Sequence, residues 1–146
     1  MMKAALLLGS LLAATPTMAK APPAWPSGTY GNVQTHEETG DMLGMEARFF
    51  VANGRHMVEF VFCEGWCNTR HRAEVAREGQ GFAFVLAEKR DDGGVDRLRF
   101  VLTQAGRGFV YQGYQGDDRT AIYEAPQRLR RIARPFGLDV AKPGKD

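Results

Sequence analysis

The chain has 146 residues, of which 44% are hydrophobic and 25% are charged, and its formal net charge is +2. This length and composition suit one folded domain and exclude a disordered chain or a body made of membrane-spanning helices. The nearly balanced charge does not favour nucleic-acid binding, which needs a strong basic excess on one face.

The N-terminus has the pattern of a secretory signal peptide. Lys3 precedes an apolar run at residues 4–14, and residues 17–19 place small side chains where signal peptidase reads them. The run is too short for a stable transmembrane helix. We expect residues 1–19 to be removed on export, with cleavage after Ala21 as the alternative. The mature protein is then expected to be periplasmic or secreted.

Residues 20–27 are rich in proline and predict an extended leader. After it, short apolar runs alternate with turn signals at nearly even spacing, which is typical of all-β proteins. Asn53-Gly54 is the strongest hairpin signal. Eight strands are expected, at residues 29–35, 42–51, 56–63, 69–77, 82–87, 95–103, 109–114 and 120–125.

Tight turns between these strands predict antiparallel neighbours. Eight such strands close into an up-and-down β-barrel, because closure removes exposed edges, and a β-sandwich is the alternative. Phe60, Phe84 and Phe100 fall on alternating apolar faces that would point inward. The outer faces of the third and fifth strands are also apolar, so a cover is expected, either a second subunit of a homodimer or the C-terminal segment.

The C-terminal part of the domain at 28–136 has two interpretations. Leu129, Ile132 and Ala133 have helical spacing and predict a short amphipathic helix over residues 127–136, ended near Pro135. A ninth strand is the competing prediction. Residues 137–146 are expected to be a loose tail.

Cys63 and Cys67 are the only cysteines. An even number in an exported protein predicts a disulfide, and Gly65 gives the small ring its flexibility. Paired thiols, a metal site and an intermolecular bridge are the alternatives. The spacing is not the redox CxxC, and zinc would need more cysteine or histidine nearby.

Five residues are candidates for ligand or partner binding. Trp66 lies in the cysteine loop, where an exposed aromatic ring is suited to anchor a partner, although it could equally pack over the barrel mouth. His71, facing inward, would be a ligand contact or a base, or else a hydrogen-bonded wall residue. Tyr111, Tyr114 and Tyr123 lie on the last two strands and would line a pocket or an interface, with ordinary wall packing as the alternative.

Two charged clusters have weaker functional interpretations. His36, Glu37, Glu38 and Asp41 share one turn, and such groups suit a divalent ion, but their spacing is not that of an EF-hand and a solvated loop is favoured. An arginine cluster would meet phosphate groups or form a solvated face. Its members are Arg128, Arg130, Arg131 and Arg134.

No Ser-His-Asp arrangement, phosphate loop or dinucleotide fingerprint is present, so the sequence supports neither catalysis nor a cofactor. The opening Gly28-Thr29-Tyr30 resembles the Gly-x-Trp of calycin-type barrels, the lipocalins and avidins, with Tyr30 in the place of the tryptophan. Arg128 or Arg130 is similar to the lipocalin arginine that covers this aromatic ring. The resemblance implies a barrel; the aromatic residues with which avidins hold biotin are missing.

The resulting hypothesis is an exported, non-catalytic binding module for a small apolar or amphipathic ligand. The alternative is a partner-binding protein, such as an inhibitor of an extracellular enzyme, that acts through the loop around Trp66. A third hypothesis is an enzyme that uses a histidine or carboxylate at the barrel mouth.

Overall fold

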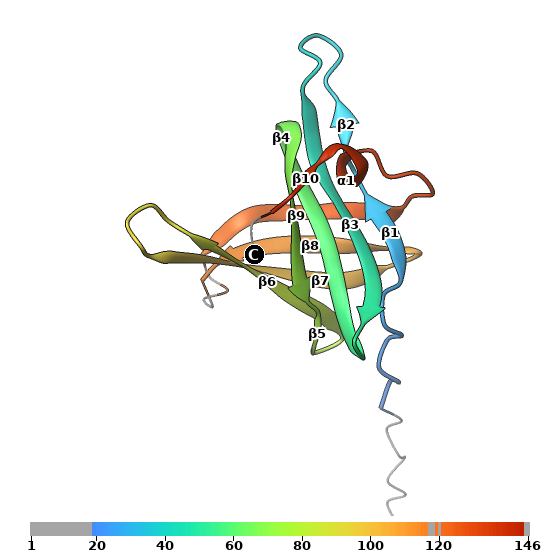
Figure 1. Cartoon of the computed structure of the whole chain (residues 1–146). Coiled ribbons are helices and arrows are strands. Elements are labelled where there is room, and N and C mark those ends of the chain that lie inside the picture. Colours follow the sequence, from blue (N-terminus) through green and yellow to red (C-terminus); the bar gives the residue numbers. More distant parts are fainter. Residues whose placement is uncertain (1–18, 117–118, 120, 145–146) are drawn as a thin grey trace, which may run out of the picture.

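The computed structural model describes residues 19–116, 119 and 121–144, so all but the last residue of the expected signal peptide lies outside the described part. Figure 1 shows a strongly twisted sheet with one short helix against its outer face, and the expected all-β class is confirmed. The elements are β1 (Gly28–Gly31), β2 (Gln34–Thr35), β3 (Met42–Ala52), β4 (Arg55–Glu74), β5 (Ala76–Glu78), β6 (Gly81–Lys89), β7 (Val95–Ala105), β8 (Gly108–Gln115), β9 (Ile122–Arg131), α1 (Gly137–Val140) and β10 (Lys142–Pro143).

The β4 strand folds back on itself at Gly65. The Cα atoms of Cys63 and Cys67 are 4.2 Å apart, whereas four residues of extended strand would span about 13 Å. Farther along, the Val75 N–H donates to the His56 carbonyl at 2.8 Å. We call residues 55–64 and 67–74 the first and second arms of β4; they correspond to the third and fourth strands expected from the sequence.

The sheet is open, so the eight-stranded closed barrel is not supported. The strand order is β10-β4-β3-β1-β9-β8-β7-β6-β5, with β2 added to β3, and this single sheet also differs from a sandwich. The pairing of β5 with β6 ends at Ala76 and Ala83, and no ladder joins β4 to β6 beyond it in the described chain. At Thr69 and Arg70 the partner of β4 is β10. The C-terminal segment thus occupies the edge that a closed barrel would give to β6.

The helix expected at residues 127–136 is wrong. β9 continues through Pro126 to Arg131, and its end pairs with β1 at Tyr30 and Gly31. Leu129 lies opposite Phe109 and is fully buried, so the alternating burial of a strand prevails over the helical spacing. The competing prediction of a strand holds in the form of a longer β9 rather than a separate element.

The main core is filled by aromatic rings. Phe60, Phe84 and Phe100 come from three strands, and their ring centroids lie 4.8 to 6.1 Å apart. The fully buried side chains with the largest volumes include Tyr111, Phe60, Phe82, Phe84, Phe100, Met45, Leu102 and Leu129. The expected inward faces of the strands therefore meet in one interior.

One end of this core is sealed by the proline-rich leader. The Trp25 ring stacks on His56 with centroids 3.8 Å apart and planes 7° apart. The Arg77 guanidinium lies 4.5 Å from the centroid of Trp25 and donates to the Pro23 carbonyl at 2.7 Å. Phe82 lies beneath the indole at 5.3 Å. We call this the closed end.

Candidate ligand-binding cleft

The opposite end of the sheet contains an open cleft with a volume of about 1070 Å³. Its walls come from β2 and the turn after it, from the tip of β4, and from β8 and β9. In Figure 1, β2 and the tip of β4 lie above β8 and β9. The lining side chains on which the argument depends are Asn32, Leu43, Phe62, Glu64, Tyr111, Glu124 and Gln127. We call this region the open end.

The cleft forms because the pairing of β1 with β9 ends at Gly31. Asn32 takes the next position, where its N–H donates to the Met45 carbonyl at 3.0 Å and its side-chain oxygen accepts the Met45 N–H at 2.8 Å. Gly44 makes this close approach feasible: a Cβ there would lie 2.8 Å from the Asn32 carbonyl oxygen, and its φ is 127°. The chain that follows β1 therefore separates from β9, and side chains rather than backbone hydrogen bonds cross the space between them.

A directed chain of hydrogen bonds crosses this space. The Met45 N–H donates to Asn32 Oδ1, and Asn32 Nδ2 donates to Gln127 Oε1 at 2.9 Å. Gln127 Nε2 then donates to Glu124 Oε1. Both amides are therefore oriented with their N–H groups toward β9, and the series of hydrogen bonds ends on a carboxylate acceptor. Among the described residues, Glu124 belongs to no ion pair.

Two aromatic side chains form the floor of the cleft. Phe62 is half-buried, and its ring centroid lies 5.1 Å from that of Phe100, so the cleft reaches the core. Tyr111 is 1% exposed. Its side chain nevertheless contributes to the lining of the cleft. Burial, together with the Glu124 charge, raises the pKa of Tyr111, which keeps the phenol protonated.

Of the five candidate binding residues, only Tyr111 lines the cleft. His71 lies on the second arm of β4, with its ring 5.5 Å from Phe60 and its Nε2 3.8 Å from the Glu88 carboxylate of β6. Burial lowers the pKa of His71 more than Glu88 raises it. Tyr114 is half-buried opposite Ile122.

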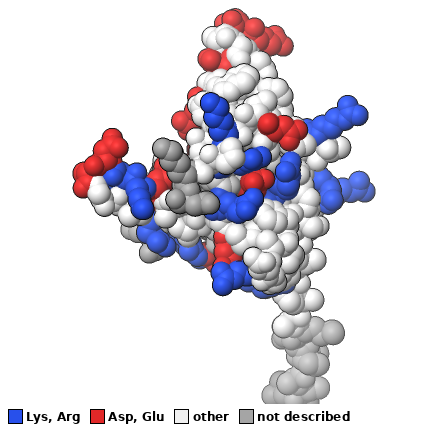
Figure 2. Space-filling model, viewed as in Figure 1, with Lys and Arg blue, Asp and Glu red and all other residues white. Residues whose placement is uncertain are grey.

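Tyr123 is half-exposed on β9. Burial and the nearby carboxylates of Glu64, Glu124 and Glu88 raise the pKa of Tyr123. The open end therefore gathers negative charge, and Figure 2 shows acidic side chains on the projecting turn that follows β2. Sequence reasoning missed six of the seven lining side chains named above, and only the inward alternation of Phe62 gave a signal for any of them. They are Asn32, Leu43, Phe62, Glu64, Glu124 and Gln127.

The predicted disulfide between Cys63 and Cys67 is confirmed. It closes the tip of β4 and holds Trp66 at the surface with 49% of its area exposed. The indole is not part of the main core; it meets the half-exposed Phe136 ring edge-on, with centroids 6.0 Å apart. Two aromatic rings thus form a small exposed patch beside the open end.

Residues 136–144, which we call the strap, are not the loose tail expected from the sequence. Leu138 is fully buried in a second core with Val61 and the disulfide. A Cβ on Gly137 would lie 3.1 Å from both disulfide sulfurs, so the helix rests directly on them. The strap is therefore the cover over the outer face of the first arm of β4, one of the two covers expected for that strand. The last two residues of the tail lie outside the described part.

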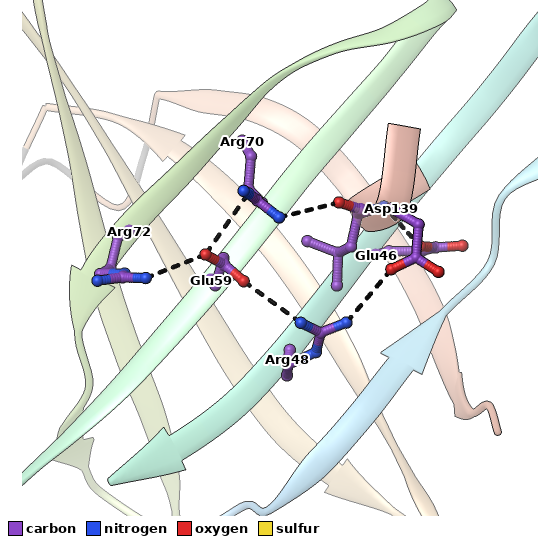
Figure 3. A network of polar contacts seen from close by, with 7 residues as sticks. Glu46, Arg48, Glu59, Arg70, Arg72 and Asp139 are labelled. Carbon is purple, nitrogen blue, oxygen red and sulfur yellow. Dashed lines mark hydrogen bonds and ion pairs between the residues drawn. The ribbon is translucent and has the colours of Figure 1, made fainter. Parts of the chain in front are cut away.

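Polar contacts fix the strap to the sheet (Figure 3). The buried Glu46 carboxylate accepts the N–H groups of Phe136 and Leu138, each at 3.0 Å. Arg70 donates to the Leu138 carbonyl at 3.2 Å and pairs with Glu59 at 3.5 Å. Arg48 links Glu59 to Asp139, and Arg72 approaches Glu59 from the other side. Three arginines thus contact the carboxylates of Glu59 and Asp139, and Glu46 binds the backbone of the strap.

The turn at residues 36–41 and the arginine cluster were the other charged candidates. The described chain has no group of three or more His, Cys, Asp or Glu side chains arranged to hold a metal ion, and the turn at 36–41 is exposed. The guanidinium that lies over the Tyr30 ring, at 5.8 Å, belongs to Arg131 rather than to Arg128 or Arg130. Those two arginines border the cleft instead.

No helix in the described ranges has the length and apolar character needed to cross a bilayer. The chain matches no protein-family model, no curated protein and no solved structure.

Proposed function

We propose that the mature chain is an exported, non-catalytic binding module that holds a small amphipathic ligand in the cleft at the open end. The observation that supports this most directly is the cleft itself, of about 1070 Å³, in which Phe62 and Tyr111 form an apolar floor beneath polar walls. Ligand sites commonly combine an apolar surface with a few convergent polar groups in a volume of a few hundred to about 1,000 Å³.

The proposal includes export and a barrel-like wall. The N-terminal signal pattern and the disulfide fit maturation in an oxidising compartment. Contacts between β4 and β6 support a wall that approaches closure at this seam. The contact of Arg131 with Tyr30 supports a relation to calycin-type barrels, with Arg131 in the role that the sequence assigned to Arg128 or Arg130.

The test fills the cleft without disturbing the core. Thr35 is exposed on β2 and lines the cleft, whereas Thr103 is exposed on β7 outside it. Protein purified from its own host is examined by native mass spectrometry. We expect the unchanged protein and the control Thr103→Trp to retain a small molecule that Thr35→Trp lacks. Equal retention by all three proteins would exclude the cleft as the binding site.

A second function, partner binding, is favoured by the exposed pair of Trp66 and Phe136. Aromatic side chains on a stiffened loop are suited to anchor an interface, because they bury much area at little entropic cost. The same mass spectra would then show a co-purified protein that Trp66→Ala loses. Because Trp66 does not line the cleft, this substitution leaves a small-molecule ligand in place.

A further inference from the structure

We infer that the ligand of this cleft is an organic cation, an amine with a small apolar body, and that Glu124 is its counter-ion. The inference rests on the proposed function and specifies the chemistry of the same site. Its basis is the direction of the hydrogen bonds between Asn32, Gln127 and Glu124, all of which donate toward the carboxylate. The Glu124 carboxylate at the end of this series accepts further hydrogen bonds, so a ligand that donates one completes the site. A positively charged donor makes the stronger bond.

The surroundings of Glu124 support a cation in particular. A Cβ on Gly113 would lie 2.9 Å from the Glu124 Cβ and 3.0 Å from a Phe100 ring atom, so the base of this side chain is at the upper edge of the aromatic core. The Tyr111 ring is fully buried below it, and Phe62 lies across the cleft floor. Aromatic faces attract cations, and they do so more strongly where water is excluded.

Charge around the cleft points the same way. Glu37, Glu38 and Glu64 line it in addition to Glu124, against the two basic side chains of Arg128 and Arg130. Leu129 is buried, so the alternation along β9 turns its two arginine neighbours toward the opposite face from the floor. The arginines therefore border the outer lip, whereas Glu124 lies beside the aromatic floor. An amine can place its charge at Glu124 and its apolar body over Phe62.

The experiment compares three probes of nearly equal shape and different charge. Benzylamine, benzyl alcohol and benzoate are titrated into the mature protein, and binding is followed by calorimetry and by chemical-shift changes of the Asn32 and Gln127 side-chain amides. We expect benzylamine to bind about tenfold more tightly than benzyl alcohol, and benzoate more weakly than either, because a charge-assisted hydrogen bond adds about that factor.

Glu124→Gln is the test variant, since it keeps the oxygen that accepts from Gln127 and removes only the charge. We expect it to weaken benzylamine binding about tenfold and to leave benzyl alcohol unchanged. Glu74→Gln is the matched control, because it removes the same charge from an exposed position on β4 that does not line the cleft. It should change benzylamine affinity less than twofold, as expected for a screened surface charge.

The outcomes separate the two proposals. Equal binding of the amine and the alcohol, tighter binding of benzoate, or an unchanged affinity in Glu124→Gln would overturn the cationic ligand while leaving the cleft as a binding site. Equal losses in Glu124→Gln and Glu74→Gln would assign the effect to the overall electrostatic potential and would overturn the role of Glu124. No shift at Asn32 or Gln127 with any probe would overturn both proposals.

Discussion

The two ends of the sheet are built from similar strands but finish them in opposite ways. At the closed end, Trp25 from the leader covers the core and is itself covered by Arg77. At the open end, β1 leaves β9 after Gly31, and Asn32 and Gln127 span the space with side-chain hydrogen bonds. One end is completed by groups of the chain itself, and the other leaves a surface that solvent or a ligand must complete.

The difference separates the part of the sheet that is stabilised by packing from the part that can bind a ligand. Aromatic side chains stabilise a core by filling its volume, so a core built from them packs in one stable arrangement. A carboxylate such as Glu124 and a buried phenol such as Tyr111 still have capacity to bind something else. In this sheet the two kinds of surface meet at Phe62, which touches both.

The largest expected effect contrasts two phenylalanines on the same face of β4. Phe60 is fully buried, so Phe60→Ala should lower the free energy of unfolding by about 3–5 kcal/mol in urea denaturation. Phe62 is half-buried at the cleft floor, and Phe62→Ala should cost less than half of that. Equal losses would mean that the floor of the cleft is packed as tightly as the core.

Removal of the disulfide should have the next largest effect. In Cys63→Ala/Cys67→Ala, the loss of a five-residue ring should lower the free energy of unfolding by about 2 kcal/mol. The strap rests on this ring, so amide hydrogen exchange should rise at Leu138 and Gly144, while exchange at Phe82 near the closed end changes little. A uniform rise along the chain would show that the disulfide supports the whole sheet instead.

A smaller effect is expected from the leader. Trp25→Ala should lower the free energy of unfolding by about 1–2 kcal/mol, because a half-buried indole loses its contacts with His56 and Phe82. Benzylamine affinity should stay unchanged, since Trp25 lies at the opposite end from the cleft. A loss of binding in this variant would contradict the separation of the two ends.

The sequence predicted the elements that depend on local signals. Alternation located the core strands, Asn53-Gly54 located the β3–β4 hairpin, and the cysteine spacing located the disulfide. Barrel closure failed as a prediction because the edge of β4 near Thr69 is taken by a segment about seventy residues later, and no local pattern encodes that pairing.

The cleft was less accessible to sequence reasoning for the same reason. Asn32, Glu124 and Gln127 act together only because β1 and β9 are neighbours in space. Each alone is an ordinary polar residue near a strand end. Tyr111 was found because aromatic residues on the last strands were singled out, whereas Tyr114 and His71 lie outside the cleft lining.

The smallest expected effect concerns pH. Burial lowers the pKa of His71 in the folded state below the ordinary histidine value of about 6.5. As the pH falls below that value, the unfolded chain therefore takes up this proton first. Stability is therefore unaffected by this group at higher pH and declines as the pH falls toward the lowered native value. His71→Gln should remove this part of the decline in urea titrations between pH 7 and 5, and the exposed control His36→Gln should not.

The most direct test of the ligand cleft is a ¹H–¹⁵N correlation spectrum of the mature protein recorded during a benzylamine titration. The side-chain amides of Asn32 and Gln127 should shift, while the indole signals of Trp25 at the closed end and Trp66 on the disulfide loop stay in place. Shifts at either indole with unchanged amide signals would contradict the account, because binding would then lie outside the cleft.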